Sequence, residues 1–172
     1  ASALPDEEYR RPAGVYFGSL HGTLNHLLAA DRIWMRRFEG AGEAPARLDA
    51  ILFERLEDLR AAREREDERI AAHVEGLSAE ALDAEFAYTT TSGQPHRQPR
   101  WEALAHFFNH QTHHRVQAHA ILTRLGVAEP PPLDLLAMQR EAARGAAGSQ
   151  PFQKRTCPWA SGRALPTARA SR

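Results

Sequence analysis

The chain contains a single cysteine, Cys157, among its 172 residues. An intramolecular disulfide is therefore excluded, and so is a cysteine-rich zinc site. No apolar run approaches the roughly 20 residues that a membrane helix needs, and no signal peptide is visible, although the chain begins at Ala1. These absences lead us to expect a cytoplasmic protein without a membrane partner.

Several catalytic motifs are also absent. The sequence has no glycine-rich phosphate loop, and Ser19, Thr23 and Thr112 stand in no recognisable nucleophile motif. Asp31 and Glu102 lack the spacing that marks a pair of catalytic carboxylates. The nine histidines are therefore the main candidates for chemistry.

The zero net charge hides an asymmetry between the two ends of the chain. Residues 142–172 carry six basic residues and no acidic one, so the 22 basic and 22 acidic residues of the chain leave 16 basic and 22 acidic residues before that segment. A body this acidic is a poor binder of nucleic acid. We expect residues 1–143 to form the folded domain and residues 144–172 to be a basic, disordered tail.

Hydrophobic periodicity predicts an all-α protein. Apolar residues recur at helical spacing, and breakers such as Gly40, Gly126 and Pro130 separate the periodic segments. The predicted helices span residues 15–38, 49–74 and 101–125, with a short fourth helix at 133–143. The dense charges of residues 60–69 are typical of a solvated helix face.

Two connections shape the predicted helical bundle. The connector of about 10 residues at 39–48 could reach roughly 33 Å when extended, which nearly matches the length of about 36 Å of a 24-residue helix. The first two long helices can therefore be parallel. Before the last long helix, residues 86–91 have strand-like composition and residues 92–95 give a turn signal, so a small hairpin or an extended crossover is expected.

The run HFFNHQTHHRVQAH at residues 106–119 is the strongest chemical signal. His110 and His114 are four residues apart, which places both imidazoles on one helix face, where they can reach one metal ion. Gln111 stands where the HExxH motif of zinc proteases has glutamate, so a metal site is indicated but no particular hydrolysis. His21 and His26 are five residues apart, and at most one of them would join that site.

The other candidate residues are expected to have ordinary structural roles. The remaining histidines, taken singly, are interpreted as surface or hydrogen-bonded core residues: His21, His73, His96, His106, His113 and His119. Asn25 and Asn109 each precede a histidine and could orient backbone or side chains near a site, but an asparagine on a helix is more often exposed, which is the expectation for both. The aromatic side chains of Phe17, Trp34, Phe38, Phe107 and Phe108 are expected in the core.

Two stretches resemble the signature segments of the DinB-like (damage-inducible) metalloenzymes. They are SLHGTLNHLLAADRIWMRRFEG at residues 19–40 and LAHFFNHQTHHRVQ at residues 104–117. The segments DEEYRR at 6–11 and TTTSGQPHRQPRWEAL at 89–104 are also similar, so the resemblance covers about residues 5–142.

The resemblance implies a four-helix bundle with an up-down-down-up order and a metal held by His26, His110 and His114. It further implies nickel or zinc as the divalent metal, a homodimer, and a low-molecular-weight thiol as a co-substrate in some relatives. Characterised relatives include thiol-dependent transferases and an isomerase.

The sequence departs from the family pattern in three places. Family members usually have a helix before DEEY, so the first helix is expected to be missing from this chain. A truncated chain, a partner or the C-terminal segment would then account for the uncovered face. Val116 replaces a common glycine and is expected to crowd a neighbouring helix. The segment after Ala143 has no counterpart in the family.

The leading functional hypothesis is a divalent-metal-dependent enzyme that acts on a small molecule, as a thiol-dependent S-transferase or a hydrolase. The alternative is a non-catalytic metal-binding or stress-response helical oligomer, in which the metal is structural. A third hypothesis is an oligomerisation module with a vestigial histidine triad. An open coordination position would favour the enzyme, and a closed four-ligand site the structural role.

Overall fold

The computed structural model describes residues 4–147, and this part of the chain is mostly helical with one small antiparallel sheet. Its elements in chain order are α1 (Asp6–Arg10), α2 (Leu20–Glu39), α3 (Leu56–Glu75), α4 (Ala79–Asp83), β1 (Glu85–Thr89), β2 (Pro95–Pro99), α5 (Arg100–Arg124) and α6 (Leu135–Ala147). The chain divides into two units after Leu133, and α6 belongs to the second.

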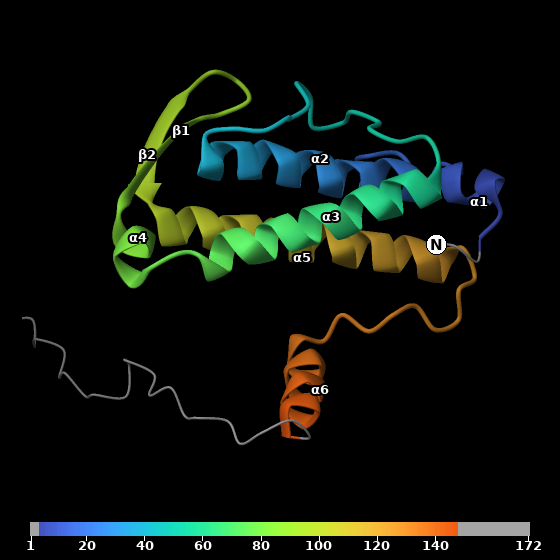
Figure 1. Ribbon diagram of the computed structural model, residues 1–172. Helices are drawn as coiled ribbons and strands as arrows, with labels where there is room; N and C mark the ends of the chain where they lie inside the picture. Colours follow the sequence, from blue (N-terminus) through green and yellow to red (C-terminus); the bar gives the residue numbers. More distant parts are fainter. Residues whose placement is uncertain (1–3, 148–172) are drawn as a thin grey trace, which may run out of the picture. The chain divides into compact units, whose positions relative to one another are not determined.

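The first unit is built around three long helices that lie side by side (Figure 1). Helices α2 and α3 run in the same direction, and α5 runs in the opposite direction between the hairpin and the far end of the bundle. The parallel pair requires a connection that returns along the whole bundle, and residues 40–55 make it (Figure 1). The parallel arrangement predicted from the connector is therefore confirmed.

Helix α2 begins five residues later than the periodicity predicts. Ser19 is extended, and its hydroxyl accepts a hydrogen bond from the Gly22 amide, which caps the helix. Residues before it form a tight turn in which the Ala13 amide donates to the Gly18 carbonyl at 2.8 Å. At the other end Gly40 adopts φ 72° and terminates the helix, as its position predicted.

Helix α3 starts at Leu56 rather than near Asp49, because the preceding segment is held extended by side chains of α2. The prediction of a solvated face for residues 60–69 is wrong in part. Ala62 and Glu66 are buried, and Arg63 pairs with a buried aspartate of α2. The charges on this face are therefore partly used to join α3 to α2.

A hairpin closes one end of the bundle. Strands β1 and β2 pair antiparallel with Phe86 opposite Gln98, so the hairpin, not an extended crossover, connects the helices. Phe86 is buried and packs its ring 5.1 Å from that of Phe38, and Phe107 of α5 joins the same cluster. Burying a side chain of this size stabilises the fold by about 1.5–3 kcal/mol. The sheet is a small departure from the predicted all-α class.

Most of the aromatic residues expected in the core are buried, including Trp34, Phe38 and Phe107. Phe108 was expected in the core, but its side chain is 46% exposed on the outer face of α5. Val116 was expected to crowd a neighbouring helix, but its side chain is 53% exposed and crowds none.

Helix α6 is described by itself. The Asp134 carboxylate accepts hydrogen bonds from the Leu136 and Ala137 amides, which caps its first turn. The helix reaches Ala147, four residues beyond the predicted end. The tail predicted from residue 144 lies, from residue 148 onward, outside the described residues. No described helix is both long enough and apolar enough to cross a membrane.

Candidate metal centre

Three histidines from two antiparallel helices converge inside the bundle. His26 lies in the second turn of α2, and His110 and His114 lie in the middle of α5. The Nε2 atom of His26 is 3.3 Å from that of His110 and 3.2 Å from that of His114. His26 and His114 are buried and His110 is half-buried. The structure thus brings together the three residues that the sequence and the resemblance indicated.

The spacing of these nitrogen atoms suits a divalent ion. With metal–nitrogen bonds of about 2.0–2.1 Å, a tetrahedral angle separates two ligand nitrogens by about 3.3 Å. Within residues 4–147, these three histidines form the one group of at least three possible ligands close enough to share an ion. The triad can therefore hold a metal ion without a large rearrangement.

Hydrogen bonds to the opposite ring nitrogens fix which way two of the imidazoles point. The Nδ1 atom of His26 is 2.8 Å from the Leu48 carbonyl oxygen, which can only accept, so Nδ1 carries the proton. The Nδ1 atom of His114 is 2.8 Å from the Gln117 side-chain oxygen and donates in the same way. Both Nε2 atoms therefore present bare lone pairs to each other, an arrangement that a shared cation would stabilise.

The site also keeps its imidazoles neutral. Burial lowers the pKa of His26 from 6.5 to about 4, and burial with the neighbouring histidines lowers the pKa of His110 to about 4. Burial lowers the pKa of His114 as well. Neutral imidazole is the form that binds a metal, so the ligand form dominates at pH 7.

Phe17 forms a wall of the site. Its ring stacks on that of His26 with centroids 3.6 Å apart and planes 14° apart, and it meets the edge of His114 at 5.5 Å. It lies in the turn before α2 and is half-buried, whereas the sequence suggested a simple core residue. The turn needs Gly22, because a Cβ atom there would collide with the Phe17 carbonyl oxygen.

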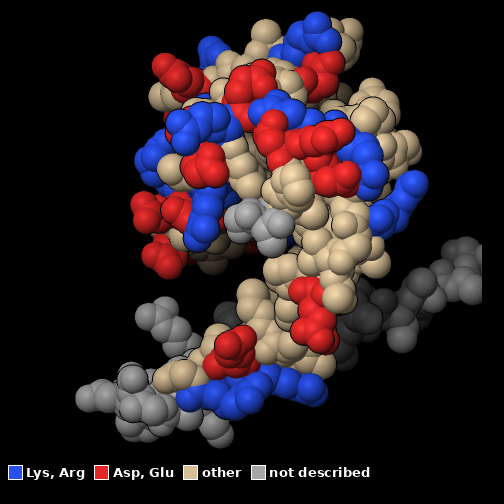
Figure 2. Space-filling view, turned by 90° about the vertical axis from the view of Figure 1, so that its right-hand side faces the viewer, with Lys and Arg blue, Asp and Glu red and all other residues tan. Residues whose placement is uncertain are grey.

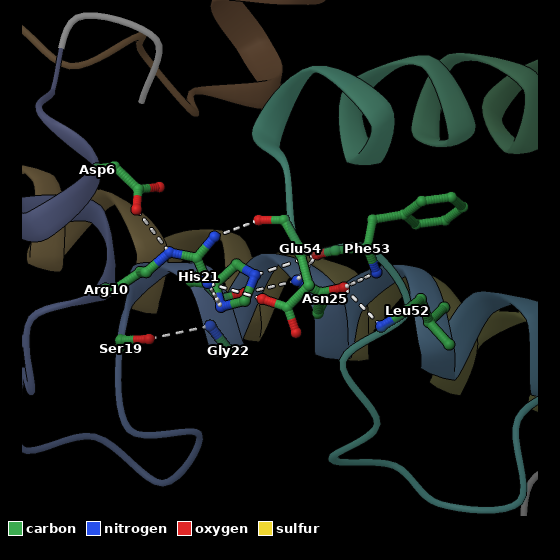
Figure 3. A network of polar contacts seen from close by, with 9 residues as sticks. All are labelled: Asp6, Arg10, Ser19, His21, Gly22, Asn25, Leu52, Phe53 and Glu54. Carbon is green, nitrogen blue, oxygen red and sulfur yellow. Dashed lines mark hydrogen bonds and ion pairs between the residues drawn. The ribbon is translucent and has the colours of Figure 1, made fainter.

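Asn25 orients backbone beside the site, a role that the sequence interpretation considered but ranked below simple exposure (Figure 3). Its side chain is fully buried, so the expectation that it is exposed is wrong. The side-chain oxygen accepts from the Leu52 amide at 2.8 Å and the Phe53 amide at 3.0 Å. The side-chain nitrogen donates to the carbonyls of His21 and Phe53. Asn25 thereby holds the crossover segment whose Leu48 carbonyl orients His26.

His21 stands beside this network but outside the triad (Figure 3). Its Nε2 atom is 3.1 Å from the Phe53 carbonyl oxygen, and its ring meets the Tyr9 ring edge-on at 5.1 Å. Arg10 of α1 donates to the Glu54 carboxylate at 2.9 Å from the same side. The interpretation of His21 as a hydrogen-bonded core residue is confirmed.

A buried acid on α2 was missed by the sequence interpretation. Asp31 is fully buried, pairs with Arg63 of α3 and accepts a hydrogen bond from Gln111. Burial raises the pKa of Asp31 to about 7, against the lowering effect of Arg63. Gln111, at the position of the glutamate in an HExxH motif, is thus directed to Asp31 and not to solvent.

The other histidines lie outside the triad, although the His113 ring lies 4.8 Å from that of His114 and the His106 ring lies 6.1 Å from that of His110. His113 contacts the Gln117 side chain at 3.1 Å, a quarter turn from the triad as its position predicted. The His106 ring lies 5.3 Å from Trp34, and His73 lies 3.8 Å from the Glu39 carboxylate. His96 stacks with Tyr88 at 5.8 Å.

A hollow of about 530 Å³ is lined by Phe17 and Leu48, which both contact His26, and by none of the three triad histidines themselves. The rim is largely apolar, with Tyr16 89% exposed and Ile51 44% exposed. Asp49 is the one charged lining residue, and its carboxylate is bonded to a neighbouring arginine.

The surface charge on one face of the first unit is mixed. Figure 2 shows acidic and basic side chains interspersed over that face, without a large patch of one sign. This face lacks the basic stripe that typically accompanies nucleic-acid binding. The absence of a nucleic-acid partner stays a prediction.

Comparison with known proteins agrees with the resemblance carried by the histidine segments. No curated protein and no solved structure matches the chain. The model of the DinB family matches residues 1–151, which is most of the sequence. The expectation that nothing after Ala143 has a counterpart in the family is therefore wrong for residues 144–151. The chain therefore belongs to the DinB family.

Proposed function

We propose that this protein is a divalent-metal-dependent enzyme whose metal is held by the Nε2 atoms of His26, His110 and His114. One observation carries the proposal: the Nε2 atoms of His26 and His114 lie 3.2 Å apart, and neither carries a proton. Both are unprotonated because the proton of each ring lies on Nδ1, where it is donated to an oxygen acceptor. Nickel or zinc is the expected metal, following the family resemblance.

A bound ion would supply a Lewis acid able to lower the pKa of a water molecule or thiol at an open coordination position. The protein's own part is positional. The Leu48 carbonyl holds the His26 ring in one tautomer, and the Phe17 ring covers the face of His26 and limits access of water. This arrangement fits transfer to or from a low-molecular-weight thiol, or hydrolysis; the thiol rests on the family resemblance.

The hollow beside Phe17 and Leu48 is the proposed entrance for a small-molecule substrate. Its exposed apolar rim, which includes Tyr16 and Ile51, suits a substrate with an apolar portion. A substrate there would lie against Phe17, whose ring stacks on that of His26.

The rival function is a structural metal site. A structural zinc site is usually closed by four protein ligands, whereas the possible ligands that cluster among residues 4–147 are three histidines without a nearby cysteine or carboxylate. Three ligands leave a position for water or substrate, which favours the enzyme.

Metal analysis of protein purified without an affinity tag tests the proposal. We expect about one divalent ion per chain, with strong loss of metal in His110→Ala and His114→Ala and much less loss in the control His113→Ala, because the His113 Nε2 atom contacts the Gln117 side chain and is not part of the ligand cluster. X-ray absorption should show three imidazole ligands with additional light-atom ligands. Equal loss in all three variants would contradict the assignment, and a metal with four protein ligands would favour the structural role.

A screen for activity with low-molecular-weight thiols, glutathione first, separates the two catalytic classes. Turnover that needs the thiol and disappears in His110→Ala supports the transferase. Thiol-independent cleavage of esters or amides that disappears in the same variant supports the hydrolase.

We also propose a homodimer and the family's up-down-down-up bundle, in which α2, α3 and α5 are the last three helices. The parallel pair α2–α3 followed by antiparallel α5 fits that order. Trp101, Phe108 and Val116 are 50%, 46% and 53% exposed on one side of α5, an apolar surface suited to a second copy. Light scattering should find a dimer that Phe108→Glu disrupts, whereas Val74→Glu on α3 should not. A monomeric wild-type protein would contradict the dimer.

A further inference from the structure

A second hollow, of about 450 Å³, lies at the hairpin end of the first unit. The last turn of α2, the loop at residues 44–46 and residues 87–91 of the hairpin line it. None of the triad histidines contributes to it. Its charged lining residues are Arg36 and Arg37, and the lining includes no carboxylate.

Arg37 has unusual surroundings for an arginine of this protein. Its guanidinium carbon lies 4.6 Å from the centre of the Trp34 ring and 5.3 Å from that of Tyr88. The side chain is half-buried, yet within residues 4–147 it makes no hydrogen bond or ion pair. By contrast, Arg63 and Arg69 each pair with carboxylates. The aromatic rings position the Arg37 guanidinium while its donors stay unused.

The charge balance around Arg37 favours an anion. Glu39, the acidic residue nearest in sequence, is already bonded to Arg69. The Arg37 side chain is half-buried and no carboxylate lines the hollow beside it, and burial lowers the pKa of its guanidinium. Arg36 and Arg37 also complement the negative end of α2, but that role requires neither the hollow nor the aromatic contacts.

The rest of the lining supplies what a small organic molecule needs. The hydroxyl of Thr90 is used inside the hairpin turn, where it accepts from the Gln94 amide at 2.9 Å. Thr89 and Thr91 are also lining residues, and their hydroxyls make no hydrogen bond within the described part of the chain. Pro45 on the opposite wall is apolar.

We propose that this hollow is a binding site for a small organic anion, whose carboxylate or phosphate group pairs with the Arg37 guanidinium. The planar fork of arginine matches both groups, and threonine hydroxyls are further donors. The apolar body of the ligand lies against Pro45. The site is separate from the triad, because Arg37 lies 11 residues beyond His26 on α2, about 16 Å along the helix axis.

Titration with benzoate and with phenyl phosphate at constant ionic strength tests the site, followed by NMR of the Trp34 indole N–H and of the backbone amides of residues 87–91, which every variant keeps. We expect a saturable shift of these signals in the wild-type protein. The affinity should fall at least tenfold in Arg37→Gln and less in Arg37→Lys, which keeps the charge but loses the fork. Arg65→Gln is the matched control, since it removes one exposed positive charge from α3 and should keep the wild-type affinity.

The stronger of the two probes identifies the anionic group, and saturable binding of either one supports the site. Shifts that stay linear with concentration for both probes would overturn the proposal, and so would equal affinities of Arg37→Gln and Arg65→Gln. Should Arg37→Gln fail to fold, the shape of the wild-type titration decides alone. Because binding is measured without turnover, the result is independent of the proposed enzyme activity.

Discussion

Replacement of Asn25 by alanine should weaken both the fold and the metal centre. The side chain is fully buried and bonds the amides of Leu52 and Phe53 at 2.8 and 3.0 Å. Alanine would leave two amide donors without partners in a protected segment. Each unsatisfied buried group costs about 1–3 kcal/mol, so the loss of two partners should lower the free energy of unfolding by about 2–6 kcal/mol.

The effect on the metal follows from the same contacts. The segment that Asn25 holds includes Leu48, whose carbonyl accepts the His26 Nδ1 proton. Loss of a partner that orients a metal-binding histidine typically lowers metal affinity about 10–100-fold. Urea unfolding of the metal-free protein and metal titration against a chromophoric chelator measure the two effects separately.

Asn109→Ala is the matched control for Asn25→Ala, because Asn109 also precedes a triad histidine but is exposed. It should change the free energy of unfolding by less than about 0.5 kcal/mol. Asn25→Asp keeps the acceptor oxygen but places a carboxylate near the carbonyls of His21 and Phe53, so it should also destabilise. Equal stability of the Asn25→Ala and Asn109→Ala proteins would refute the reasoning.

Three further predictions follow from titratable groups and from backbone geometry. The pKa values of about 4 for His26 and His110 lie below the ordinary 6.5, so the folded metal-free protein binds fewer protons, and its urea midpoint should fall as the pH drops from about 6.5 to 4. The pKa of Asp31 is raised from 3.8 to about 7, so protonation of this group stabilises the folded protein as the pH falls from about 7 to 4. Asp31→Asn removes that contribution, and its urea midpoint should therefore fall more steeply with falling pH than that of the wild-type protein. An unchanged dependence of the urea midpoint on pH would contradict this. Gly22→Ala should lower the melting temperature and the metal affinity together, because its Cβ atom collides with backbone, whereas Gly76→Ala, whose Cβ atom meets backbone oxygen at an ordinary 3.4 Å, should do neither.

The sequence was sufficient for the features that depend on local periodicity. The i, i+4 spacing of His110 and His114 placed both on one face of α5, and the structure directs both toward α2. The parallel path of α2 and α3 followed from connector length. The choice of His26 over His21 came from the family resemblance, since spacing alone allowed either.

The features that were missed depend on contacts between distant segments. Asn25 and Asp31 are polar residues inside a helix, where propensity favours exposure, yet both are fully buried because their partners come from residues 52–53 and from α3 and α5. The start of α3 was misplaced for the same reason: helical periodicity continues back to Ile51, but the backbone there is bonded to Asn25. No pattern within one segment carries that information.

The crossover between parallel helices and the metal centre depend on one set of hydrogen bonds. An extended segment packed against a bundle cannot satisfy its own amides and carbonyls, so α2 supplies polar partners to it from Asn25 and from His21. The same segment then presents its Leu48 carbonyl to His26. Stability and metal affinity should therefore fall together in Asn25 variants. In His110→Ala the metal affinity should fall while the stability of the metal-free protein changes little. This substitution removes a half-buried ring whose pKa is already depressed, so it takes away a metal ligand but breaks no hydrogen bond of the crossover segment.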